Sequence, residues 1–183
     1  ALSGGYGIGF PEGHANRAVA SGVPDALTIP HMDALDNAPR AGLWYSLGCW
    51  SAAVDYDTFG EHWVTNPTGG GVAYVGNSRY GWGCPGYPGQ CVSDLYSQQF
   101  ARSLFGKGLV HAGLVHADAK HQYVGVAHAD NYMRYAMYEL NLLGDPEMPV
   151  WTDAPRPLSV VCPDAVLLGS GAAAVRVEAL SAG

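Results

Sequence analysis

The sequence predicts an α/β fold, a mostly parallel sheet flanked by helices, with a short β segment at its C-terminal end. Two apolar runs of strand length, 42–48 and 72–76, lack polar alternation, which is typical of strands buried on both faces of a parallel sheet. A stretch with helical character separates them, as a parallel connection requires. With 183 residues, 48% hydrophobic and 14% charged, the chain is long enough for a packed core and is not disordered.

The first half of the chain is expected to alternate strands with short helices. Residues 15–30 show no period and are expected to be irregular. Pro39 and the pair Asn66-Pro67 end the two helices, because proline cannot continue a helix and disfavours the helical conformation in the residue before it. The expected elements are a strand at 4–10, a helix at 31–38, a strand at 42–48, a helix at 58–65 and a strand at 72–76.

The second half is expected to be mainly helical. A long loop runs from Asn77 to about Gln90, and apolar residues then recur near the helical period over 92–105. The further expected elements are helices at 108–121 and 129–142 and a short closing strand at 148–152. After Pro155 the composition changes, and 157–183 resembles two strands around a turn, which cannot hold a core by themselves.

Charge and hydropathy exclude two classes of partner. Nine basic against 16 acidic residues give a net charge of −7, which makes the chain a poor nucleic-acid binder. The longest apolar runs are too short for a membrane-spanning helix. The chain opens at Ala1 without a methionine, so we expect it to be a piece of a longer precursor.

Two of the four cysteines flank a loop rich in proline and glycine, Cys84-Pro-Gly-Tyr-Pro-Gly-Gln-Cys91. A local disulfide there suits an extracytoplasmic protein, and two free thiols are the alternative. A metal site would need further ligands at short spacing, and none lie beside these cysteines.

The strongest chemical pair consists of one histidine and one cysteine, each at the end of an apolar strand. His14 lies on a loop just after the strand at 4–10, and Cys49 follows the strand at 42–48. If these strands are parallel neighbours, both side chains emerge at the same edge of the sheet. A Cys–His catalytic pair needs that arrangement, because the imidazole must take the thiol proton or stabilise the thiolate. The alternative reading of Cys49 is a small buried hydrophobe.

The order of these blocks resembles the gingipain family of cysteine peptidases, which are relatives of caspases and legumains. The resemblance covers nearly the whole chain, and the 35 positions from His14 to Cys49 are similar to the family's spacing. The blocks that carry it are Y-G-I-G-F-P-E-G-H-A-N, G-L-W-Y-S-L-G-C-W-S-A-A, N-P-T-G-G-G-V-A-Y-V-G-N-S-R-Y-G-W and N-L-L-G-D-P-E-M-P-V-W.

The resemblance implies a cysteine endopeptidase with a Cys–His dyad. It implies that Cys49 is the nucleophile, that His14 is its acid–base partner, and that Trp82 covers the S1 substrate pocket. The backbone N–H groups of Ala15 and Cys49 are implied as the oxyanion hole. Ala15 stands where the family usually has glycine, so a positive φ at that position would be strained. Gingipains prefer basic P1 residues, and the sequence ties no particular carboxylate to that preference.

The resemblance also implies how the chain is organised. Residues 1–152 are expected to be a peptidase-like catalytic subdomain, incomplete at its N-terminus, and 153–183 the start of an immunoglobulin-like β-sandwich. The implied partners are a protein or peptide substrate and either the remaining half of the catalytic domain or another copy of the chain. The implied location is extracellular or on a bacterial cell surface.

No cofactor or metal is expected to be required. Four histidines do not share a helix face, since their spacing misses the usual ligand geometry: His111, His116, His121 and His128. Asp55 and Asp57 could bind a structural Ca²⁺, or they lie on a solvated loop. The alternative to an enzyme is a non-catalytic, peptidase-like module of an extracellular protein that assembles with copies of itself.

Overall fold

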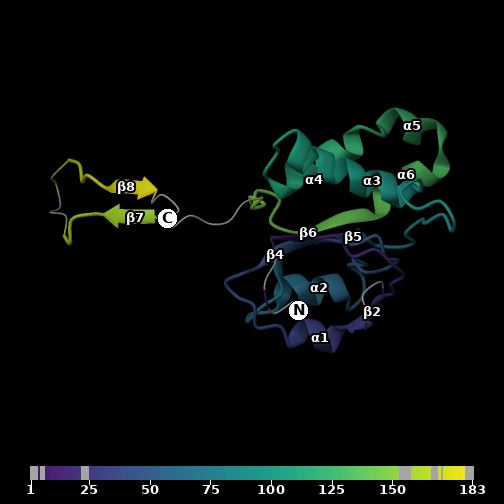
Figure 1. Ribbon diagram of the computed structural model, residues 1–183, viewed down its shortest axis with the longest axis horizontal. Coiled ribbons are helices and arrows are strands. Elements are labelled where there is room, and N and C mark those ends of the chain that lie inside the picture. The colour runs from purple at the N-terminus through teal and green to yellow at the C-terminus, as the bar shows by residue number, and fades with distance from the viewer. Residues whose placement is uncertain are drawn as a thin grey trace. The chain divides into compact units, whose positions relative to one another are not determined.

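The structure is a computed structural model that describes residue 4 and residues 7–21, 25–152, 158–165, 169 and 171–179 (Figure 1). The chain divides into two compact units, Ala1–Thr152 and Asp153–Gly183.

The first unit is built on a four-stranded sheet with the order β1-β4-β5-β6. Strands β1 (Ile8–Gly9), β4 (Gly42–Tyr45) and β5 (Gly71–Asn77) run parallel, and β6 (Leu140–Gly144) is antiparallel to β5. The prediction of a mostly parallel α/β sheet is therefore confirmed. The two central strands, β4 and β5, are the two apolar runs from which it was made.

Helices cover both faces of this sheet (Figure 1). One face carries α1 and α2, and the other carries the helices of the second half of the unit. The bounds are α1 (Ile29–Asp33), α2 (Phe59–Thr65), α3 (Val92–Ala101), a π-helical turn η2 (Arg102–Gly106), α4 (Ala112–His121), α5 (Val124–Ala129) and α6 (Asn131–Glu139).

Two buried clusters form the core, one on each face of the sheet. Side chains alternate across the central strands: Leu43 and Tyr45 of β4 enter the cluster under α3–α6, whereas Trp44 enters the cluster under α1 and α2. The rings of Trp44 and Trp63 pack edge to face with centroids 4.7 Å apart. Both faces of β4 are thus apolar because both are covered, which fixes the register of the strand against its neighbours.

Several boundaries differ from the predictions. The expected helix at 129–142 is wrong at its end, because 140–142 belong to β6, where apolar side chains pair with β5 and pack into both clusters. The stretch at 148–152 is not a strand; Pro149 makes one isolated bridge to His111. Residues 15–30 contain a small antiparallel pair, β2 (Val19–Ala20) with β3 (Leu27–Thr28).

Other predicted elements keep their type and change in length. The strand expected at 4–10 is shorter in the structure: β1 covers Ile8–Gly9, the described residues Gly4, Gly7 and Phe10 are not in a strand, and residues 5 and 6 lie outside the described residues. The helix at 31–38 begins earlier and ends at Asp33, and the helix at 108–121 begins at Ala112. The single helix at 92–105 is α3 followed by η2.

The described residues of the second unit form an antiparallel strand pair, β7 (Leu158–Val161) with β8 (Arg176–Ala179). Val160, Val161 and Val177 are all exposed. Apolar strands of this kind need further packing partners to form a core.

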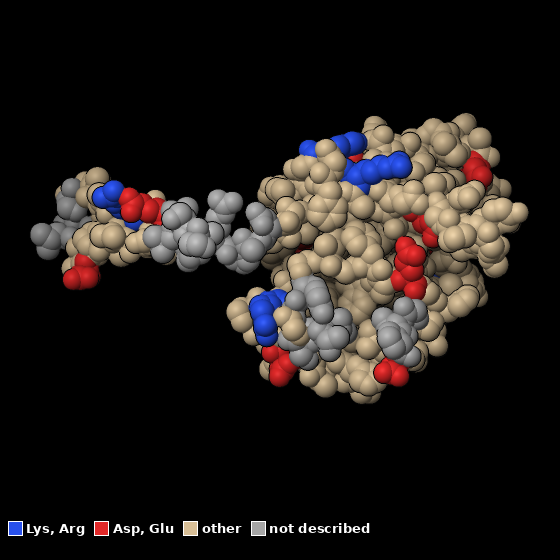
Figure 2. Space-filling model, viewed as in Figure 1, with Lys and Arg blue, Asp and Glu red and all other residues tan. Residues whose placement is uncertain are grey.

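Charged side chains are sparse on the face of the molecule drawn in Figure 2, most of which is uncharged. No helix within the described part of the chain is long and apolar enough to span a membrane.

Candidate active site

The carboxyl ends of β1 and β4 bring the predicted histidine and cysteine segments together. The two strands pair in parallel register, with Ile8 opposite Leu43 and Gly9 opposite Trp44. Beyond them, Ala15 packs directly on Gly48: a Cβ added to Gly48 would lie 2.3 Å from the Cβ of Ala15. The residue after the candidate histidine therefore touches the residue before the candidate cysteine.

His14 lies in a turn that is held by hydrogen bonds. Its carbonyl accepts hydrogen bonds from the backbone N–H and from the hydroxyl of Ser21, at 2.7 and 2.6 Å. Gly13, immediately before it, has a φ of 150°, a region that favours glycine. Asn16 closes the turn by accepting from the N–H groups of Ala18 and Val19. The imidazole is exposed on this anchored backbone.

Buried polar side chains hold the backbone around Cys49. Asn77, 1% exposed at the end of β5, donates to the carbonyls of Leu47 and Gly48 at 3.0 and 3.3 Å. The Ser51 hydroxyl donates to the Gly48 carbonyl at 3.3 Å. The Cys49 thiol is half-buried and donates to the carbonyl of Gly81 at 3.7 Å, a usual distance for sulfur.

The residue after the cysteine adopts a conformation that is uncommon for a side-chain-bearing residue. Trp50 has a φ of 59°, and the structure around it is tied to Arg79. Its N–H donates to the Arg79 carbonyl at 2.6 Å, and the Arg79 guanidinium lies 4.9 Å from the centroid of its ring. Arg79 is itself fixed by a two-pronged ion pair with Asp55, which lowers the pKa of that carboxyl.

Two backbone donors are free at the junction of the segments. Among the described residues, the N–H groups of Ala15 and Cys49 donate to no protein group. The N of Ala15 would lie 3.3 Å from a Cβ on Gly48, so it lies beside the cysteine turn. Ala15 stands where the family usually has glycine, and its φ is not positive. Its backbone therefore carries no left-handed strain; among the described residues other than glycine, Trp50 alone has a positive φ.

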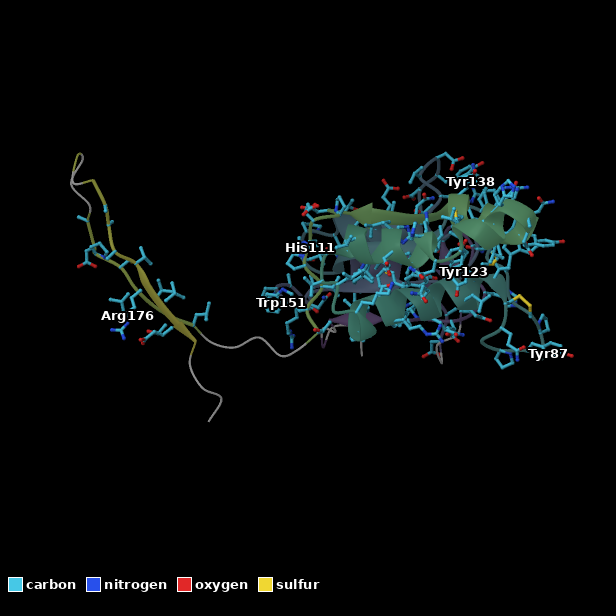
Figure 3. The ribbon with its side chains drawn as sticks, turned by 90° about the horizontal axis from the view of Figure 1, so that it is seen from above. Tyr87, His111, Tyr123, Tyr138, Trp151 and Arg176 are labelled. Carbon is cyan, nitrogen blue, oxygen red and sulfur yellow. A yellow bond between two sulfur atoms is a disulfide. The ribbon has the colours of Figure 1, made fainter. Side chains whose placement is uncertain are left out.

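Trp82 follows the segment that touches the cysteine. Its backbone N–H donates to the Ser93 hydroxyl of α3 at 2.8 Å, and its ring packs against Tyr132 of α6 with centroids 4.8 Å apart. A disulfide between Cys84 and Cys91 closes the loop just beyond it, with the Cα atoms 5.3 Å apart. Figure 3 shows this bond near Tyr87 at the edge of the unit.

A buried carboxylate, Glu139, lies behind the same segment. It is the last residue of α6 and is 4% exposed, and neither of its oxygens has a hydrogen bond of good geometry. Burial raises the pKa of Glu139 to about 7, an effect that the Trp82 indole, the Tyr80 backbone N–H and the Arg79 charge partly offset. The indole N–H of Trp82 is likewise buried without a well-formed bond.

Comparisons with known proteins identify the family of the chain. Residues 1–151 match peptidase family C25. The chain belongs to that family. The match includes every element of the first unit and both members of the candidate dyad. A comparison with curated proteins found no match.

Solved gingipain structures share the fold of this C25 chain. It is similar to the Arg-specific cysteine proteinase gingipain R, with a TM-score of 0.71 and 15% identity, over 90% of this chain and 38% of that one. A complex of the pro- and mature domains of Porphyromonas gingivalis RgpB gives the same TM-score of 0.71 and 15% identity, over 90% of this chain and 39% of that one. A further protease structure matches with a TM-score of 0.62 and 16% identity, over 91% of this chain and 40% of that one.

These likenesses establish a cysteine peptidase fold for the chain. The chain spans about two fifths of the length of each of these structures.

Asp55 and Asp57 each bind a different side chain in this C25 chain. Asp55 is engaged by Arg79, and Asp57 accepts from His62 of α2 at 2.7 Å. Asp33 of α1 binds the other ring nitrogen of His62 at 2.5 Å, and these carboxylates raise the pKa of the imidazole, Asp33 foremost. No group of three potential ligands that could hold a metal ion occurs within the described ranges.

Sequence reasoning missed Asn77 and Glu139. Asn77 could have been found as the polar residue that directly follows the apolar strand 72–76, since such residues lie at the carboxyl edge of a sheet. Glu139 carried no comparable signal, because the helix expected at 129–142 placed it inside a helix and not at the junction between α6 and β6.

Proposed function

We propose that the chain carries the nucleophile and the acid–base histidine of a cysteine endopeptidase, with Cys49 and His14 in these roles. The observation that carries the proposal is the parallel pairing of β1 with β4, which leads to the contact between Ala15 and Gly48. The family match supports the reaction class.

The proposed reaction uses groups of the protein and water alone. His14 takes the thiol proton as the Cys49 sulfur bonds to the scissile carbonyl carbon. The free N–H groups of Ala15 and Cys49 hold the oxyanion, and donors of this kind contribute about 3 kcal/mol each. His14 then protonates the leaving amine as the C–N bond breaks. Water deprotonated by His14 attacks the thioester carbonyl, the C–S bond breaks, and His14 returns the proton to the Cys49 sulfur. No metal or cofactor takes part in the proposed steps.

The substrate and setting follow from the family and from the loop that carries Trp82. We propose protein or peptide substrates, with Trp82 on the wall of the S1 pocket. The Arg specificity named for gingipain R makes a basic P1 residue the first to test. The remaining wall comes, in this proposal, from the rest of a longer catalytic domain or from another copy of the chain. The disulfide supports an extracellular or cell-surface location.

Alkylation of Cys49 tests the dyad on the chain as it stands. Cys162 is a free, exposed cysteine in the second unit and serves as an internal reference. We expect iodoacetamide to label Cys49 at least about tenfold faster than Cys162 near neutral pH, because a histidine partner activates the thiol as a nucleophile. His14→Asn should remove this advantage, whereas His128→Asn, the replacement of an exposed histidine on α5, should not. Equal labelling of Cys49 and Cys162 in the native chain would contradict the dyad and favour the non-catalytic module.

Turnover is tested in a protein that includes the rest of the catalytic domain. Cys49→Ala should reduce kcat/KM by about 10³-fold or more, because the covalent route is lost. Cys162→Ala should leave turnover unchanged, since this cysteine is exposed in the second unit.

A further inference from the structure

The segment Arg79–Trp82 lies between the candidate nucleophile and a buried acid. Its first residue accepts from the N–H of Trp50, and its third residue, Gly81, accepts from the Cys49 thiol. A Cβ on Gly81 would lie 2.0 Å from the carbonyl oxygen of Leu47, so the segment packs tightly on the cysteine turn. Any group that fixes this segment therefore also fixes one wall of the site.

The strand ladder places Glu139 behind this segment. Leu140 pairs with Asn77, and the Ser78 N–H extends the ladder by donating to the Glu139 carbonyl at 2.7 Å. The Asn141 side chain donates to the same carbonyl at 2.9 Å. The backbone of Glu139 is thus held firmly while its carboxylate is 4% exposed and has no well-formed hydrogen bond.

The groups that face this carboxylate come from the Arg79–Trp82 segment. They are the Tyr80 N–H, the Trp82 indole N–H and the Arg79 guanidinium, which is the one charged group to act on it in the described structure. The Trp82 indole N–H is itself buried and unpaired. Burying a carboxylate without compensation is costly, so its burial beside three groups of one short segment points to an interaction with that segment.

We propose that Glu139 is a positioning residue whose carboxylate fixes the Arg79–Trp82 segment against the Cys49 turn. Ionised, it attracts the two N–H groups and the guanidinium; protonated, it loses that attraction and the segment loosens. The consequence for substrate binding rests on the proposed peptidase function, since Trp82 is assigned to the S1 wall there. The positioning itself does not depend on catalysis.

The Trp82 indole N–H reports the state of Glu139 directly. The chain has five tryptophans, and Trp82→Phe assigns the Trp82 resonance in an NMR spectrum of the indole N–H groups. We expect this resonance to shift with a midpoint at about pH 7 in the native chain, following the raised pKa of Glu139. Glu139→Gln should abolish the shift, and Glu147→Gln, which removes a carboxylate whose side chain is 87% exposed, should preserve it.

Cys49 supplies the second readout. Freed from Glu139, the Arg79–Trp82 segment should cover the half-buried thiol less well, so Glu139→Gln should raise the alkylation rate of Cys49 severalfold while that of Cys162 stays constant. A Trp82 resonance that does not move between pH 5.5 and 8.5 in the native chain would overturn the proposal even if the variant fails to fold. Failure of the dyad would instead appear as equal labelling of Cys49 and Cys162 in the native chain, so the two failures are distinguishable.

Discussion

The free energy of unfolding of Glu139→Gln, measured relative to that of the native chain, should be higher at high pH than at low pH. The folded-state pKa of Glu139 is about 7, against 4.5 for an ordinary glutamate. At a pH between these two values, the carboxyl is therefore more fully protonated in the folded protein than in the unfolded chain. The free energy of unfolding of the native chain therefore falls as the pH rises through this window. Complete ionisation of a group shifted this far costs about 3 kcal/mol, which is an upper limit for the effect.

Gln has the size of Glu and cannot ionise, so the free-energy cost of burying it does not change with pH. Urea unfolding of both proteins at pH 4.5, 6 and 8, followed by tryptophan fluorescence, gives the free energies of unfolding. The difference, variant minus native, should rise by about 2–3 kcal/mol across the series. Glu147→Gln is the matched control and should give a flat difference, because that side chain is exposed. A difference for Glu139→Gln that stays constant within about 0.5 kcal/mol would refute the assignment of a buried, hard-to-ionise carboxyl.

Three further perturbations test other parts of the unit. Burial, and next the charge of Lys120, lower the pKa of His116 to about 4. The stability of the native chain should therefore fall as the pH drops below about 6.5, and His116→Asn should remove that loss in the same urea series. Gly48→Ala should cost about 1–3 kcal/mol and slow Cys49 labelling, because the new methyl group overlaps Ala15; no change in either would contradict the contact. His62→Gln should weaken the tie between α1 and α2 chiefly below the raised pKa of this histidine, and thermal melts at pH 5 and 9 should reveal a larger loss at pH 5.

The fold class could be predicted because its signals are local in the chain. The runs that became β4 and β5 are apolar on both faces, and only a sheet covered on both sides makes that pattern favourable. The helix break at Asn66-Pro67 acts through backbone geometry that needs no tertiary information, whereas α1 ends at Asp33, well before the break expected at Pro39. For the same reason the two segments that carry the candidate dyad could be placed after apolar strands.

The boundary between α6 and β6 could not be predicted in this way. Leu140 and Leu142 fit a helical apolar face as well as a strand, and pairing with β5 decides between the two. Once that pairing forms, the Glu139 carbonyl accepts from Ser78 and its side chain is carried behind the Arg79–Trp82 segment.

The sequence by itself determined the α/β class, the apolar strands and the two segments that bear His14 and Cys49. Only the tertiary structure decided that Ala15 touches Gly48, that Asn77 holds the cysteine turn, and that Glu139 is buried beside Trp82. The physical reason is the separation along the chain of the residues that interact. Strand and helix patterns are set by neighbours along the chain, whereas the burial and pairing of a polar side chain depend on segments that meet only when the sheet closes.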